Sequence, residues 1–259
     1  MTRLDGYDLI YGTHKMTSGL DYGLGYGIID TATGYNNATQ IRDAINRTTM
    51  YPTIVSKFNP SDFENDIETV MTNHVMDLGK YPDIVLLHSP FKTNDENLRA
   101  VLKLKKLFSD KLIGVSNFDL RQLSYLIDNN FIPDVVQIEY HPLFQPTKLV
   151  EYCHSKGIKI MGYRPFGKGL VLHNETILEL AANMQIEPAH LVLKWIKSKN
   201  IIPVVSSNNP KHVAFNKFYQ NVKLDEATIK KIDNLNIGSI ASTCMLKFSQ
   251  VDPSVQPIF

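Results

Sequence analysis

Short apolar runs alternate with amphipathic stretches along most of the chain. The runs are rich in β-branched residues and bounded by Gly, Pro or charged residues, a pattern that predicts buried strands. We predict strands at 9–13, 28–30, 53–57, 83–88, 112–117, 135–140, 159–163 and 201–205. Apolar residues at helical spacing predict helices at 38–46, 62–71, 98–107, 119–128, 147–156, 174–184, 188–198, 210–218 and 225–235. Ser61 is the expected N-cap of the helix at 62–71.

Most of the predicted strands are continuously apolar, which is typical of a parallel sheet covered on both faces. Eight strand–helix units within 259 residues favour an α/β fold, a single (β/α)8 TIM barrel that forms one domain over residues 1–259. No G-x-G-x-x-G follows an early strand, which weakens the alternative of an open dinucleotide-binding sheet. Residues 16–25 hold three glycines and make a poor helix, so we expect a shortened first helix.

Composition narrows the classes of partner. The formal charge of +1 and the lack of a long Lys/Arg run argue against a nucleic-acid surface. Cys153 and Cys244 stand far apart, which fits a reducing compartment without disulfides. No segment of about 18 apolar residues could span a bilayer, and no apolar run at the N-terminus resembles a signal peptide. The eight histidines include no H-E-x-x-H. We therefore expect a soluble, cytoplasmic protein with no metal.

The stretch Gly27–Tyr35 reads G-I-I-D-T-A-T-G-Y and places a charged residue directly after an apolar run. A carboxylate at the end of a buried strand, such as Asp30, requires a cationic partner, because an unpaired buried charge is costly. Tyr35 follows a glycine on the next loop, which could return its hydroxyl toward Asp30. The pair suggests a proton-handling site. Alternatively, Asp30 caps the next helix and Tyr35 is an ordinary surface residue.

The ends of the next two predicted strands favour the proton-handling interpretation. Lys57 ends one strand and His88 the next, and reactive groups gather at the carboxyl ends of barrel strands. The pKa of an unperturbed Tyr is about 10, and a nearby ammonium would favour the phenolate of Tyr35 while Asp30 orients Lys57. A His beside the phenol can orient a carbonyl oxygen. Taken singly, Lys57 could extend to the rim and His88 could be a hydrogen-bonded core histidine. Together these groups suit carbonyl reduction by hydride.

These residues resemble the Asp-Tyr-Lys-His tetrad of the aldo-keto reductase family. The matching segments are D-T-A-x-x-Y at Asp30 to Tyr35, the Lys that ends T-I-V-S-K, and the His that opens H-S-P. Further segments that match in order are G-T at 12–13, G-V-S-N-F from 114, Q-I-E-Y-H-P from 137, G-Y-R-P-F-G-K-G from 162 and S-S-N-N-P-K-H-V-A-F-N at 206–216. The resemblance covers nearly the whole chain and implies a monomeric barrel enzyme.

The resemblance implies NAD(P)H-dependent reduction of aldehydes or ketones to alcohols by hydride transfer, the activity of a carbonyl reductase or alcohol dehydrogenase. Tyr35 would be the proton donor, Lys57 and Asp30 its tuning partners, and His88 the orienting group. Residues that match cofactor-binding positions are Gly12, Thr13, Ser116, Asn117, Gln137, Tyr163, Arg164, Phe166, Gly167, Ser206, Ser207, His212 and Asn216. Ser116, Asn117 and Gln137 would bind the carboxamide, and Tyr163 would stack on the nicotinamide. Alternatively, Asn117 and Gln137 could cap strand ends, and Tyr163 could be a core aromatic residue.

The segment at 206–216 departs from the family where the 2′-phosphate of NADPH is usually held. Ser206 and His212 stand at the positions of a Lys and an Arg, and Phe215 stands at that of a Glu; Asn216 remains. Losing two charge-assisted contacts costs about 2 to 4 kcal/mol, roughly 30- to 1,000-fold in affinity, although Lys211 could compensate in part. We therefore expect NADPH preference to be weakened and NADH to be accepted.

Loops around the expected site also depart from the family. Ser89 follows the expected catalytic His where the family often has Trp, and the N-terminal hairpin is reduced to M-T-R-L-D-G-Y. Shorter loops imply an open site with loose substrate selection. Aromatic wall candidates are Phe91, Tyr140, Phe166 and Phe248.

Two other functions stay open from the sequence. A cofactor-binding or regulatory protein on the same fold would explain the lost phosphate contacts without requiring turnover. A barrel lyase that uses Lys57 as a Schiff base is disfavoured, because Asp30 and Tyr35 suit reduction better.

Overall fold

The computed structural model describes residues 4, 6–16 and 19–242. The strands are β1 (Ile10–Gly12), β2 (Ile28–Asp30), β3 (Thr53–Phe58), β4 (Ile84–Leu87), β5 (Leu112–Ser116), β6 (Val135–Glu139), β7 (Lys159–Tyr163) and β8 (Ile201–Val205). Each strand pairs in parallel with the next, and β8 returns to β1, so the sheet closes into a barrel. This confirms the predicted (β/α)8 TIM barrel.

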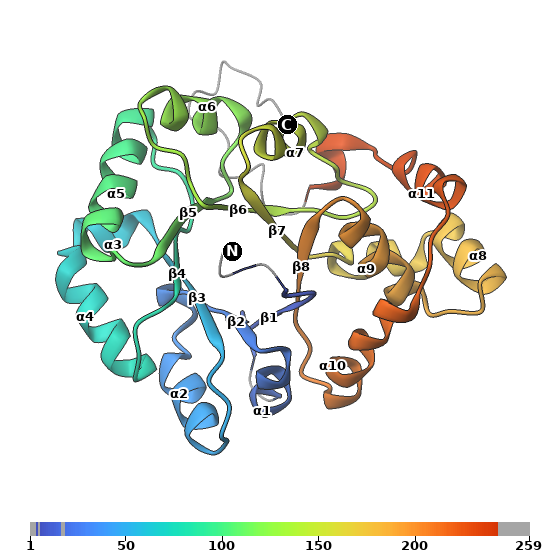
Figure 1. Ribbon diagram of the computed structural model, residues 1–259, viewed down its shortest axis with the longest axis horizontal. Coiled ribbons are helices and arrows are strands. Elements are labelled where there is room, and N and C mark those ends of the chain that lie inside the picture. The colour runs from blue at the N-terminus through green and yellow to red at the C-terminus, as the bar shows by residue number, and fades with distance from the viewer. Residues whose placement is uncertain (1–3, 5, 17–18, 243–259) are drawn as a thin grey trace.

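Helices surround the barrel, as Figure 1 shows in a view that looks into the ring of strands. They are α1 (Leu20–Gly23), α2 (Ala38–Asn46), α3 (Pro60–Glu64), α4 (Ile67–Leu78), α5 (Asn94–Leu107), α6 (Leu120–Asp128), α7 (Thr147–Ser155), α8 (Glu175–Asn183), α9 (Pro188–Ser198), α10 (Pro210–Asn216) and α11 (Glu226–Asp233). Short 3-10 segments lie at Leu24–Tyr26, Thr33–Tyr35, Gly167–His173, Lys217–Asn221 and Gly238–Ala241. The expected shortening of the first helix is confirmed, since α1 has four residues.

The strands bury side chains on both faces. Ile28, Val55, Leu86 and Met161 belong to an apolar cluster with members from most strands, while a larger cluster joins strand residues such as Val85 to the surrounding helices. This double burial explains why the strands read as continuous apolar runs. Among the described residues, no helix is long and apolar enough to cross a membrane.

The helix that we predicted at 62–71 is instead two helices. Asn59 caps α3, with Pro60 at its first position, so the predicted N-cap Ser61 is wrong. Asp66 adopts a left-handed conformation (φ 53°) and its carboxylate accepts a hydrogen bond from the amide of Glu68, which starts α4. The chain therefore leaves α3 at Asn65, its C-cap, and the capping carboxylate of Asp66 begins α4.

Most other helix boundaries follow local capping signals. Thr93 and Glu96 form a reciprocal capping box at the start of α5, and Asp119 and Gln122 do the same for α6.

Cys153 is buried on α7, whereas Cys244 lies outside the described residues. The expected lack of disulfides therefore stays a prediction.

Candidate active site

A cavity of about 640 Å³ opens at the carboxyl ends of the strands. It is lined by Gly12, His14, Lys15, Asp30, Tyr35, His88, Ser116, Asn117, Gln137, Tyr163, Arg164, Pro165, Phe166, Lys168, Gly169, Val204, Val205 and Ser206. Asp30, Ser116 and Tyr163 are each the last residue of a strand, so the barrel itself brings them to one end.

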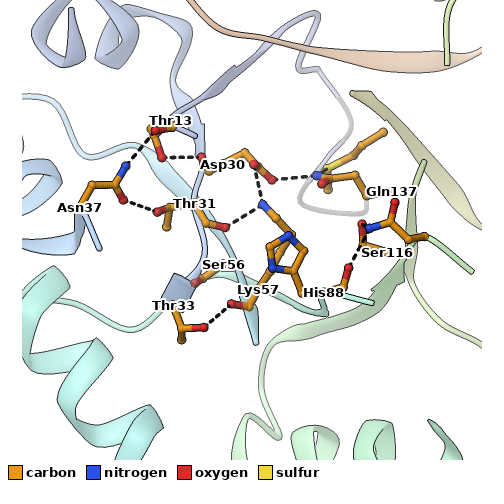
Figure 2. A network of polar contacts seen from close by, with 12 residues as sticks. Thr13, Asp30, Thr31, Thr33, Asn37, Ser56, Lys57, His88, Ser116 and Gln137 are labelled. Atoms are coloured by element: carbon orange, nitrogen blue, oxygen red, sulfur yellow. Dashed lines mark hydrogen bonds and ion pairs between the residues drawn. The ribbon is translucent and has the colours of Figure 1, made fainter. Parts of the chain in front are cut away.

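A buried ion pair lies at the base of this cavity. Lys57 Nζ is 2.6 Å from Asp30 Oδ1 and also donates to the backbone oxygen of Thr31 at 2.8 Å. Gln137 Nε2 donates to the other carboxylate oxygen, Asp30 Oδ2, at 2.7 Å, and Figure 2 shows the carboxylate held between the two side chains. Both charged side chains are at least 95% buried, with 1% of Lys57 and 5% of Asp30 exposed. The carboxylate at the strand end thus has the cationic partner that the sequence required.

Strand geometry explains how Lys57 reaches Asp30. The β3 strand pairs with β2 and continues to Phe58, so Lys57 is its penultimate residue. We predicted that Lys57 would be the last residue of this strand. Thr13 braces the backbone behind the carboxylate, because its hydroxyl donates to the Asp30 backbone oxygen at 2.9 Å.

Tyr35 lies over this ion pair in a 3-10 segment that follows β2. Lys57 Nζ is 4.9 Å from the centroid of the Tyr35 ring. The His88 ring packs edge-on against Tyr35 with centroids 5.7 Å apart, and the His14 ring lies 4.8 Å from Tyr35. Tyr35 is therefore a phenol in contact with one ammonium and two imidazoles.

Burial dominates the proton affinities of the groups beneath Tyr35. Burial lowers the pKa of Lys57, and the charge and hydrogen bond of Asp30 oppose that effect. Burial, together with the charges of Lys57 and His14, lowers the pKa of His88 to about 3. His88 is therefore neutral at physiological pH, and its buried Nδ1 has no hydrogen-bond partner within the described protein. His88 also lines the cavity, so its ring can contact a ligand bound there.

The opposite wall of the cavity is tied together by Asn117. Its Nδ2 donates to the backbone oxygen of His88 at 2.9 Å, and its Oδ1 accepts from the Tyr163 hydroxyl at 2.5 Å. Asn117 and Arg164 directly follow β5 and β7, and both are non-glycine residues with positive φ, 65° and 54°. The guanidinium of Arg164 lies 5.9 Å from the Tyr163 ring centroid and 4.0 Å from buried Glu139.

The cavity brings together most of the predicted site residues, but not all of them. Those that do not line it are Lys57, Thr13, Gly167, Ser207, His212 and Asn216. Lys57 and Thr13 lie behind Asp30. His212 is exposed on α10, within 3.5 Å of the Ser207 hydroxyl, and Asn216 is a buried residue at the end of the same helix.

Two of the predicted aromatic wall residues are wrong. Tyr140 is buried and stacks on Trp195, with centroids 5.3 Å apart, and Phe91 packs against Phe63. Each faces the helices and not the cavity. Phe166 does line the cavity, and Phe248 lies outside the described residues.

Sequence reasoning missed the cations at the rim. His14 and Lys15 directly follow the predicted G-T segment, and Lys168 lies in the loop after β7. Position is the only signal that marks these residues in the sequence. His14 and Lys15 lie one or two residues beyond the G-T segment, and Lys168 lies inside a loop that was already assigned to ligand binding. The rim carries basic side chains, and the carboxylate that lines the cavity, Asp30, is paired with Lys57.

Comparison with known proteins gives consistent matches. The sequence model described as the aldo/keto reductase family matches residues 20–237. The NAD(P)H-dependent D-xylose reductase I,II of Candida tropicalis is 29% identical, over 83% of this chain and 82% of the relative. The glyoxal reductase of Bacillus subtilis is 28% identical, over 82% of this chain and 79% of the relative.

A solved structure agrees with these relatives. An aldo-keto reductase from a Medee basin deep-sea metagenome library superimposes with a TM-score of 0.82 at 27% identity, over 89% of this chain and 91% of that one. The family match spans far more than half of the chain. The chain is therefore an oxidoreductase that belongs to the aldo/keto reductase family.

Proposed function

We propose that this chain reduces small aldehydes or ketones with NAD(P)H and that Tyr35 donates the proton. The observation that carries the proposal is the buried Asp30–Lys57 pair, with an Nζ–Oδ1 distance of 2.6 Å, directly below the Tyr35 ring. A metal-independent carbonyl reduction needs an acid beside the carbonyl oxygen, and a phenol near an ammonium is such an acid.

Each group below Tyr35 has a distinct part in the proposal. The Lys57 ammonium favours the phenolate and so increases the acidity of the Tyr35 hydroxyl. Asp30 and the backbone oxygen of Thr31 hold the ammonium in place by accepting its hydrogen bonds at 2.6 and 2.8 Å. Neutral His88 can offer a nitrogen to the substrate oxygen and orient it toward Tyr35. In this scheme the proton moves from Tyr35 Oη to the substrate oxygen as hydride reaches the carbonyl carbon.

The cavity suits a nicotinamide cofactor. Its volume of about 640 Å³ is within the usual range for ligand sites, which is about 300–1,000 Å³. Tyr163 offers a ring face, Ser116 and Asn117 offer polar atoms beside it, and Lys15, Arg164 and Lys168 offer positive charge for the phosphates. Gln137 differs from the expectation, because its amide nitrogen already binds Asp30 and leaves its oxygen for a carboxamide. The bound cofactor would supply the hydride.

The proposal is tested by following NAD(P)H consumption with a panel of aldehydes. We expect Tyr35→Phe to lose about 10²- to 10⁴-fold in kcat with cofactor binding retained, because only the proton donor is removed. Tyr51→Phe is the matched control, since Tyr51 is 90% exposed and does not line the cavity. It should behave as wild type.

The same assay separates the remaining alternative. If wild type and Tyr35→Phe bind cofactor equally and neither consumes it with any substrate, the chain is a cofactor-binding protein without turnover. Exposed His212, in place of the usual Arg, is the observation that keeps this alternative open.

A further inference from the structure

Once Tyr35 has given up its proton, it must recover one before the next turnover, and its inner neighbours are poor sources. Lys57 is 1% exposed and already binds Asp30 and Thr31. His88 has a pKa of about 3, so it carries no exchangeable imidazolium proton near neutral pH. Tyr35 is itself only partly exposed, so a group that contacts both Tyr35 and solvent is the best placed to restore the proton.

His14 meets both conditions. It follows Thr13 on the loop after β1, it is exposed, and it lines the cavity. Its ring lies against Tyr35 with centroids 4.8 Å apart and planes tilted by 57°. Imidazole is the side chain whose unperturbed pKa allows proton exchange near neutrality.

We propose that His14 is a positioning residue that relays protons from solvent to Tyr35, an inference that rests on the proposed function. The His14 imidazolium gives one proton to the Tyr35 phenolate, directly or through one water, and becomes neutral imidazole. Neutral His14 then takes one proton from bulk water. One proton enters from solvent for each carbonyl reduced, so the proton count balances with the one that Tyr35 gives to the alkoxide.

The charges around His14 set the pH range of this relay. Burial is the largest influence and lowers the pKa of His14; Lys15 beside it, Arg164 after β7 and Lys57 on β3 lower it further. Asp30 on β2 raises it, and among the described residues Tyr35 and His88 are further ionisable groups near the ring. The net effect lowers the pKa of His14, so its imidazolium gives up a proton more readily than a free imidazolium does.

Chemical rescue tests the relay. At saturating cofactor and substrate, we expect His14→Ala to lower kcat on the order of tenfold at neutral and alkaline pH. Added imidazole should restore kcat, because the exposed position of His14 admits a small base. His14→Phe keeps an aromatic ring against Tyr35 but cannot exchange a proton, so it should be equally slow and should not respond to imidazole.

The outcomes separate a relay from simple packing. Full kcat in His14→Phe would overturn the relay, and so would a lack of response of His14→Ala to imidazole from about pH 5 to about pH 9. Either result would leave Tyr35→Phe inactive and the proposed function intact. A wild type without turnover would overturn both. An NMR titration gives a readout that needs no turnover: the apparent pKa of His14 should change in Tyr35→Phe, and an unchanged value contradicts the coupling.

Discussion

At the level of single residues, the carboxylate of Asp30 has the largest energetic consequence. Its two oxygens accept hydrogen bonds from Lys57 and Gln137 at 2.6 and 2.7 Å, and it is almost fully buried. Buried ion pairs are seldom more stable than well-packed apolar substitutes, but removing one partner leaves an uncompensated charge. The pair is therefore better explained by its position under Tyr35 than by stability.

We predict that Lys57→Met loses about 3–5 kcal/mol of unfolding free energy as well as activity, because Asp30 is left charged and unpaired. Urea denaturation followed by circular dichroism measures the loss. The double variant Asp30→Asn/Lys57→Met should recover a large part of the stability and none of the activity. Equal stability of the single and double variants would contradict this account of the pair.

At the level of elements, α4 is joined to the barrel by one buried polar contact. Ser56 on β3 and His74 on α4 are hydrogen-bonded, with an Oγ–Nε2 distance of 2.7 Å, and both are buried. Burial lowers the pKa of His74 from 6.5 to about 4. The folded protein therefore holds His74 neutral at a pH where the unfolded chain would protonate it.

This contact predicts sensitivity to acid. Because the folded pKa lies below the unfolded one, the unfolded state binds the extra proton as pH falls from about 6.5 to about 4, and stability falls with it. Between pH 7 and pH 5 the loss from His74 is about 2 kcal/mol. His74→Gln should show a smaller loss of unfolding free energy over that interval. His154→Gln, at an exposed position on α7, should keep the wild-type pH dependence; if His74→Gln also keeps it, the assignment is wrong.

At the level of the whole molecule, positive charge is distributed unevenly along the proposed cofactor site. Lys15, Arg164 and Lys168 lie at the cavity rim, whereas the resemblance assigns Ser206 and His212 to the positions that would bind the 2′-phosphate. The chain thus offers charge for phosphates common to both cofactors and little for the phosphate that distinguishes them.

We predict that NADPH binds less than about 100-fold more tightly than NADH in fluorescence titrations, because two charge-assisted contacts are missing. Ser206→Lys/His212→Arg should raise NADPH affinity by roughly tenfold or more and leave NADH affinity unchanged. A wild-type preference for NADPH above that limit, or a double variant that binds both cofactors alike, would refute the prediction.

The sequence predicted features that depend on local chemistry. It missed features that depend on which way a side chain faces in the folded protein. Strands buried on both faces read as apolar runs, and groups such as Asp30 and Tyr163 lie at their ends, so one pattern predicted both barrel and site. Tyr140 was misassigned because an aromatic beyond a strand end reads the same whether it faces the cavity or Trp195. His14 was missed because nothing periodic marks a loop residue, and only folding brings it to Tyr35.

The left-handed residues Asn117 and Arg164 have a further consequence for protein engineering. Each holds a left-handed backbone conformation on a loop that carries cavity side chains; Asn tolerates this conformation, whereas Arg164 adopts it at a cost of about 1–2 kcal/mol. Glycine at Asn117 would remove its hydrogen bonds to the His88 backbone and to Tyr163, whereas glycine at Arg164 would relieve the backbone and remove a positive charge from the rim. A consensus or glycine-scanning library built for heat tolerance should therefore vary codon 164 and leave codon 117 unchanged.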